Sequence, residues 1–72
     1  MHQQEPSQAQ IKSVIALYSN GQVQEALDSV QTLIKDYPKE AILHNICGAC
    51  YASLGQLDTA IKRYKKSLSI NP

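Results

Sequence analysis

The sequence predicts an all-α fold of four helices, arranged as two helix–turn–helix units. Apolar residues recur three and four positions apart through most of the chain, which is the spacing of one helix face. A shift of 34 residues aligns the first half of the chain with the second half. No segment alternates apolar and polar residues, so no strand is expected.

The internal repeat indicates how the chain is organised. The aligned positions include the pairs Gly21 and Gly55, Ala26 and Ala60, and Pro38 and Pro72. Glycine and proline end helices, and a small residue allows two helices to approach closely. We therefore expect a flexible N-terminal tail over residues 1–6 and one helical-repeat domain over 7–72, divided into repeat one (7–40) and repeat two (41–72).

The first unit supplies two amphipathic helices. Ser7 and Gln10 have the spacing of a capping box, and Gly21 follows the first helix. The apolar face of this helix consists of Ile11, Val14, Ile15, Leu17 and Tyr18. The second helix ends before Pro38. Its apolar face consists of Val23, Ala26, Leu27, Val30, Leu33 and Ile34.

The second unit repeats this plan. The third helix runs from about Glu40 to Ser53 and is apolar almost all round, so it must be covered on more than one side. Gly55 ends it. The fourth helix ends at Asn71 and Pro72, and its apolar residues are Leu57, Ala60, Ile61, Tyr64 and Leu68.

These 34-residue units resemble the tetratricopeptide repeat. The second unit carries the resemblance through Gly48, Tyr51, Leu54, Gly55, Ala60, Tyr64 and Pro72. It departs from the family at His44, where the family has tryptophan, and at Cys47, where the family has leucine. The first unit is more degenerate. It keeps Leu17, Gly21, Ala26, Leu33 and Pro38, but has Gln10 and Val14 at the tryptophan and small-residue positions.

The resemblance implies a right-handed α–α superhelix that binds proteins or peptides and is not an enzyme. The first helix of each unit lines a concave groove in this family. The implied partner-binding groove consists of Ile11, Ile15, Tyr18, Ile42, Asn45, Ala49 and Ala52. Some family members hold a C-terminal carboxylate with polar groove residues. Ile11, Ile15 and Ala49 occupy those positions here, so an apolar or helical ligand is expected instead.

A second apolar surface is expected on the last helix. Repeat arrays bury each unit against the next, and no further unit follows in this sequence. The uncovered residues form a candidate self-association face, Leu57, Ile61, Tyr64 and Leu68. Either the chain is a piece of a longer array or this face pairs with another copy. We expect a homo-oligomer in either case.

Two local motifs invite a chemical interpretation. His44, Cys47 and Cys50 are spaced three residues apart, which suggests a zinc or redox site. Zinc needs a fourth ligand, and His2 is the only other histidine in the sequence. The two cysteines also fall within a helix. We therefore interpret them as buried thiols and expect no metal, cofactor or catalytic residue. Residues 62–66 form a basic cluster around Tyr64, which we interpret as a solvated helix face.

Composition restricts the classes of function. The 72-residue chain is 43% hydrophobic and 18% charged, with a formal net charge of +1, so neither a nucleic-acid partner nor a membrane is expected. The opening residues lack the pattern of a signal peptide, and the two cysteines fit a reducing compartment, which predicts a cytoplasmic protein. The alternative to an interaction scaffold is an N-terminal repeat appendage of a longer enzyme, such as a glycosyl- or sulfotransferase.

Overall fold

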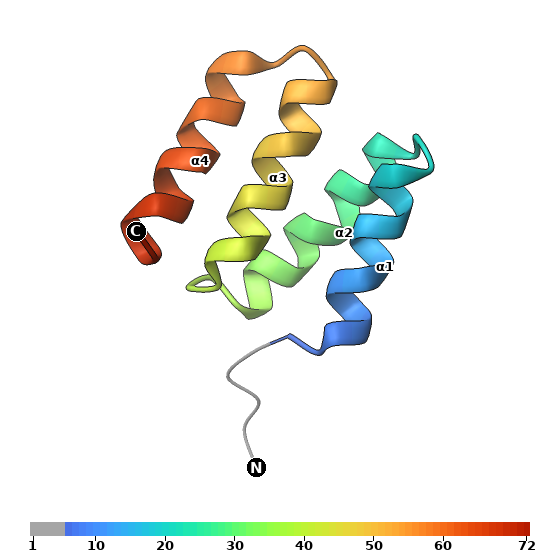
Figure 1. The fold of residues 1–72 in the computed structure, drawn as a ribbon, viewed down its shortest axis with the longest axis horizontal. Helices are drawn as coiled ribbons and strands as arrows, with labels where there is room; N and C mark the ends of the chain where they lie inside the picture. The colour runs from blue at the N-terminus through green and yellow to red at the C-terminus, as the bar shows by residue number, and fades with distance from the viewer. Residues whose placement is uncertain (1–5) are drawn as a thin grey trace.

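The computed structural model describes residues 6–72. Four helices follow one another along the chain, with no strand within this range: α1 (Gln8–Ser19), α2 (Val23–Asp36), α3 (Ala41–Ser53) and α4 (Leu57–Ile70). Each helix packs against the next, which confirms the predicted all-α fold of two helical hairpins (Figure 1). Most of the predicted tail, together with His2, lies outside the described residues. Pro6 is buried beside Ile11 and Glu40.

The helix ends follow from local chemistry. Ser7 caps α1 by the predicted capping box, because its hydroxyl accepts from the Gln10 amide N–H at 3.1 Å while the Gln10 side chain accepts from the Ser7 amide N–H at 2.8 Å. Gly21 and Gly55 adopt φ values of +83° and +79° after α1 and α3, a conformation that glycine reaches without strain. The residue after α2, Tyr37, precedes Pro38, as the proline predicts.

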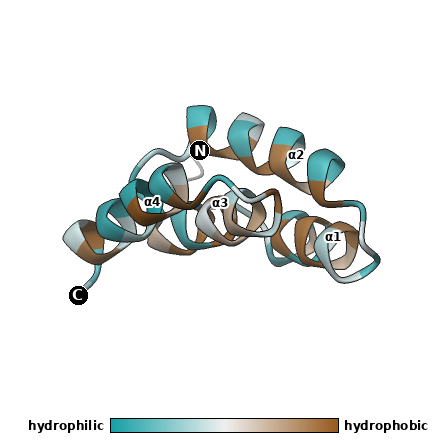
Figure 2. Ribbon diagram, turned by 90° about the horizontal axis from the view of Figure 1, so that it is seen from above, coloured by the Kyte–Doolittle hydropathy of each residue, from teal (hydrophilic) through white to brown (hydrophobic). Residues whose placement is uncertain are grey.

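The core lies between α2 and α3. Figure 2 shows α2 above α1 and α3, with its hydrophobic side turned toward them and its hydrophilic side turned outward. The buried cluster comprises Val14, Ala26, Leu27, Val30, Leu33, Leu43, Cys47 and Cys50. The apolar character of α3 is therefore explained by its position, because α2 packs on one side of it and α4 on another.

Small residues bring α3 and α4 together. Gly48 is buried on α3, and the ring of Tyr64 from α4 lies directly over it. A Cβ atom at position 48 would lie 2.8 Å from Cε1 of Tyr64, which is closer than two carbon atoms pack. Ala60 is also buried, and the Ser67 hydroxyl donates a hydrogen bond to the Ala41 carbonyl oxygen at 3.0 Å. These contacts fix the spacing and register of the second hairpin.

Within residues 6–72, no helix combines the length and the apolar character that crossing a membrane requires.

Candidate functional site

A shallow hollow lies between α1 and α3, on the side of α3 that turns away from α2. Its volume is about 270 Å³. Four of the groove residues predicted by the resemblance meet there, Ile15, Tyr18, Asn45 and Ala49. Ile15 is 43% exposed, so its apolar side chain is open to a ligand. We call this hollow, with its lining residues, the groove.

The first and third helices supply the groove because each has one face left after core packing. Val14 of α1 and Cys47 and Cys50 of α3 point into the core. Residues 15 and 18 of α1 lie next to Val14, at the edge of its core-facing side, and residues 45 and 49 of α3, four positions apart, lie on the side of α3 away from Cys47. The periodicity that builds the core therefore also leaves a second, partly apolar surface.

A hydrogen bond spans one end of the groove. The Tyr18 hydroxyl and the Ser53 hydroxyl are 3.1 Å apart and join α1 to the end of α3. Tyr18 is half-buried and also packs against the core cluster. Tyr18 is therefore both a packing residue and a groove residue, because it contacts the core cluster and also lines the groove. Its hydroxyl bond holds the ring edge toward the groove.

The remaining predicted groove residues lie elsewhere. Ile11 is half-buried and lines a separate small pocket with Pro6, Gln8 and Glu40. Ile42 is 41% exposed and Ala52 is half-buried, and neither lines the groove. Two residues that sequence reasoning did not assign to the groove complete it, Ile46 and Tyr64. Tyr64 reaches it because Gly48 leaves room for the ring to cross α3.

The predicted self-association residues divide into exposed and half-buried positions. Leu57, Ile61 and Leu68 are 61%, 50% and 60% exposed. Tyr64 is half-buried over Gly48. These three aliphatic side chains lie along one side of α4, because they are spaced by four and seven residues. Figure 1 shows α4 at the outer edge of the four helices.

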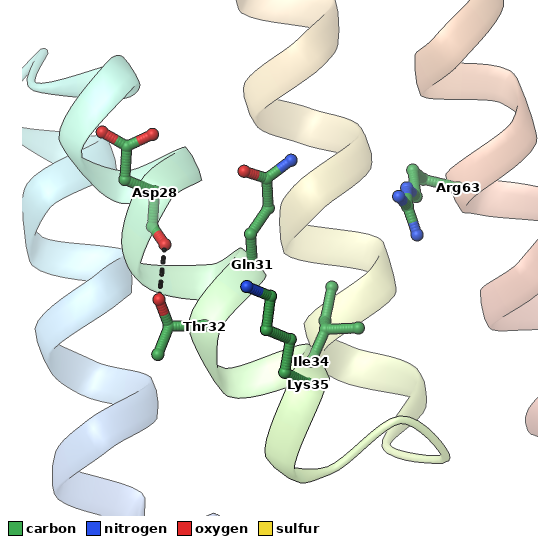
Figure 3. Close-up of a pocket in the computed structure, with 6 residues that line it drawn as sticks. All are labelled: Asp28, Gln31, Thr32, Ile34, Lys35 and Arg63. Carbon is green, nitrogen blue, oxygen red and sulfur yellow. Dashed lines mark hydrogen bonds between the residues drawn. The ribbon is translucent and has the colours of Figure 1, made fainter.

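A larger pocket of about 440 Å³ lies between α2 and α4, on the other side of α3 from the groove. Figure 3 shows Gln31 and Ile34 on α2 on the side toward Arg63 of α4, while the side chains of Lys35 and Asp28 point away from Arg63. The Gln31 amide donates to the Tyr51 hydroxyl at 2.8 Å. Arg63 is half-buried, so it differs from its exposed neighbours Lys62, Lys65 and Lys66 in the basic cluster. The lining mixes both charges, and no sequence motif connects these residues.

The histidine and the two cysteines of α3 are packing residues. Cys47 and Cys50 are fully buried and free, and His44 is 3% exposed. Nε2 of His44 lies 2.8 Å from the Pro38 carbonyl oxygen, a hydrogen bond in which the ring N–H donates and ties α3 to the turn before it. Across residues 6–72, no three His, Cys, Asp or Glu side chains are grouped so that they could hold a metal ion.

Burial makes both thiols unreactive. Loss of solvation raises the pKa of Cys47, an effect that Arg63 partly opposes, and loss of solvation together with the neighbouring Cys47 raises the pKa of Cys50. The nucleophilic form of cysteine is the thiolate, so both side chains stay protonated and shielded at neutral pH.

We expect the thiols to react with a disulfide reagent at pH 8 at least about a hundredfold more slowly in the folded chain than in urea, because reaction requires local opening. The measurement is the absorbance of the released thiol with time. A Ser69→Cys variant provides the control, since position 69 is exposed and its thiol should react rapidly in the folded chain. Rapid reaction of the parent chain while its helical signal is intact would contradict this expectation.

Comparison with known proteins gives a distant similarity to a subunit of a protein complex. Anaphase-promoting complex subunit 3 from Dictyostelium discoideum is 31% identical over 64 residues, which cover 89% of this chain. The chain spans 7% of the length of that relative. No family model matches the chain, and no solved structure matches it.

Proposed function

We propose that the chain is a pair of tetratricopeptide-type repeats that acts as a protein-interaction module, binding a protein or peptide partner, or a second copy of itself, through apolar surfaces. The groove carries the first part of this proposal. It places Ile15, Tyr18 and Ala49 from two separate helices around one hollow that a side chain can enter.

Two further observations support the proposal. The 34-residue repeat corresponds to two hairpins whose first helices both border the groove. The distant relative is by its name a subunit of a complex, and similarity to such a subunit favours association with other proteins over catalysis. The family implied by the residues and the kind of surface in the structure therefore point to the same class of function.

The lining predicts the chemistry of the ligand. Isoleucine, alanine and two tyrosine rings offer apolar contact, and the Asn45 amide supplies one group that can both donate and accept hydrogen bonds. Among residues 6–72, no charged side chain lines this hollow. A peptide with one aliphatic side chain inserted between α1 and α3, and a backbone group bonded to Asn45, fits these requirements.

We expect selection from a library of displayed ten-residue peptides to enrich sequences with a central aliphatic residue. Ile15→Glu should lower the affinity of the chain for the selected peptides at least about tenfold, because it places a charge on the apolar wall of the groove. The affinity is measured by titration of a labelled peptide.

Ala16→Glu is the matched control, because it introduces the same charge at an exposed position of the same helix outside the groove. Its affinity should stay within about twofold of the parent chain. If no peptide is enriched, or if the two variants lower the peptide affinity equally, the groove is rejected as the binding site.

A further inference from the structure

The exposed side of α4 has the pattern of a helix-pairing surface. Leu57, Ile61, Tyr64 and Leu68 are spaced by four, three and four residues, which places them in one row along the helix. We call this row the α4 stripe. Three of its four side chains are at least half exposed, although each is a large aliphatic group. Isolated exposed leucines are common on proteins, but a continuous row of them is not.

The structure contains a covered version of the same row. Residues 34 positions earlier are Val23, Leu27, Val30 and Ile34 of α2. Leu27 and Val30 are buried, and Val23 and Ile34 pack against the same core cluster, which includes Leu43, Cys47 and Cys50 of α3. The α2 row is therefore covered by a helix, whereas the equivalent α4 stripe is exposed. A helix is thus the element whose shape suits the α4 stripe.

The first helix of another copy would make a poor cover. It would stack on the α4 stripe as α3 stacks on α2, presenting Ala9, Ser13 and Ala16 where α3 presents Leu43, Cys47 and Cys50. Lys12 would replace Ile46 at the edge of this contact. Burying a lysine and a serine in place of apolar residues costs solvation energy and forms little apolar contact. Head-to-tail stacking of copies is therefore disfavoured.

The α4 helix of a second copy is a better cover. We propose that two copies of the chain associate through their α4 stripes, with the two helices antiparallel across a two-fold axis. Leu57 then lies opposite Leu68 of the other copy, and Ile61 lies opposite its Tyr64. Both layers pair apolar side chains, and the symmetry repeats each contact twice. This inference rests on the proposed role in protein association, and the α4 stripe shares only Tyr64 with the groove.

Charge complementarity selects the antiparallel orientation. Asp58 and Lys65 are both exposed and lie on the same flank of the α4 stripe, because they are seven residues apart. In the antiparallel pair, Asp58 of each copy approaches Lys65 of the other, which gives two opposite-charge contacts. In a parallel pair the flank that carries Asp58 and Lys65 faces the opposite flank of the other copy, which carries Ala60 and Ser67, so no opposite-charge contact forms. Charge therefore favours the antiparallel pair.

The test is the mass of the 72-residue chain in solution by sedimentation equilibrium, from about 10 µM to about 1 mM, at low salt. The mass should rise from 8.0 kDa toward twice that value and no further. Lys65→Asp and Asp58→Lys should each weaken the dimer at least about tenfold, because each creates two like-charge contacts. The double variant Asp58→Lys/Lys65→Asp should restore the affinity to within about threefold of the parent chain.

Lys66→Asp is the matched control, since it makes the same charge change on a different side of the helix and should leave the dimer within about twofold. Helical content by circular dichroism verifies that each variant is folded. A strict monomer at about 1 mM, growth beyond a dimer, or failure of the double variant to restore affinity would each overturn the antiparallel pairing. The groove variant Ile15→Glu should leave the dimer unchanged, so loss of peptide binding and loss of dimerisation are separate results.

Discussion

Leu43→Ala is expected to lower the free energy of unfolding by about 3 kcal/mol. Leu43 is fully buried in the core cluster between α2 and α3, and it is the largest of the fully buried side chains. Its truncation removes transfer free energy and leaves a cavity that neighbouring helices fill only in part. A domain of this size has a total stability of roughly 4 to 10 kcal/mol, so the loss is a large share of it.

Thermal and urea denaturation followed by circular dichroism measure this effect. A fall in Tm of roughly 15 °C corresponds to the expected free energy for a chain of this length. Leu68→Ala is the matched control, because Leu68 is 60% exposed, and it should change stability by less than about 0.5 kcal/mol when the chain is dilute enough to be monomeric. Equal effects of the two substitutions would contradict the position of the core.

Gly48→Leu is expected to destabilise the second hairpin by about 3 kcal/mol or more, because the new side chain must occupy the space of the Tyr64 ring. Even a Cβ atom at this position would lie within 3.1 Å of three ring atoms. Gly48→Ala should cost less, about 1 kcal/mol, because alanine favours the helix and offsets part of the crowding. The loss is again measured as the free energy of unfolding in urea.

A double-mutant cycle identifies the cause of the loss. Tyr64→Ala removes the ring, so Gly48→Ala should be neutral or stabilising in that background. The coupling between the two substitutions is then at least about 1 kcal/mol. Gly55→Ala is a useful comparison because its expected cost arises from the positive φ at that turn rather than from a neighbouring side chain, and it should not couple to Tyr64→Ala. Equal coupling of both glycines would mean that the ring does not cause the effect.

Local signals were sufficient to predict the four helices. The capping box at Ser7, the glycines at positions 21 and 55, and Pro38 each act on their immediate neighbours, so their effect can be read without knowing the fold. The apolar periodicity likewise predicted burial of Val30, Cys47 and Ala60, because one face of each helix must pack against another element.

Positions that depend on how helices cross could not be predicted in the same way. The resemblance to a known repeat brought Ile15, Tyr18, Asn45 and Ala49 together as groove residues, and they share one hollow in the structure. Tyr64 was assigned to the apolar side of its own helix, but whether its ring also reaches the groove depends on the close approach of α4 to Gly48. Such an approach is a property of two helices rather than of one segment.

The same limit applies to the basic cluster. Spacing along α4 predicted a solvated face for residues 62–66, yet Arg63 is half-buried and faces α2 across the pocket. Lys62 is exposed and the next residue, Arg63, is half-buried, so a small rotation of α4 about its own axis changes which side chain is covered. The way α4 packs on α3 determines that rotation.

The distribution of buried residues has a consequence for motion. Four residues of α2 and five of α3 are buried, whereas α1 and α4 contribute one each, Val14 and Ala60. Amide protons in the two central helices should therefore exchange with solvent last, and those of the outer helices first, because fewer side chains of α1 and α4 are fully buried. The groove thus has one wall on a firmly held helix and one on a loosely held helix. A ligand that contacts both walls uses part of its binding free energy to hold α1 closed, so α1 opens more slowly when the ligand is bound.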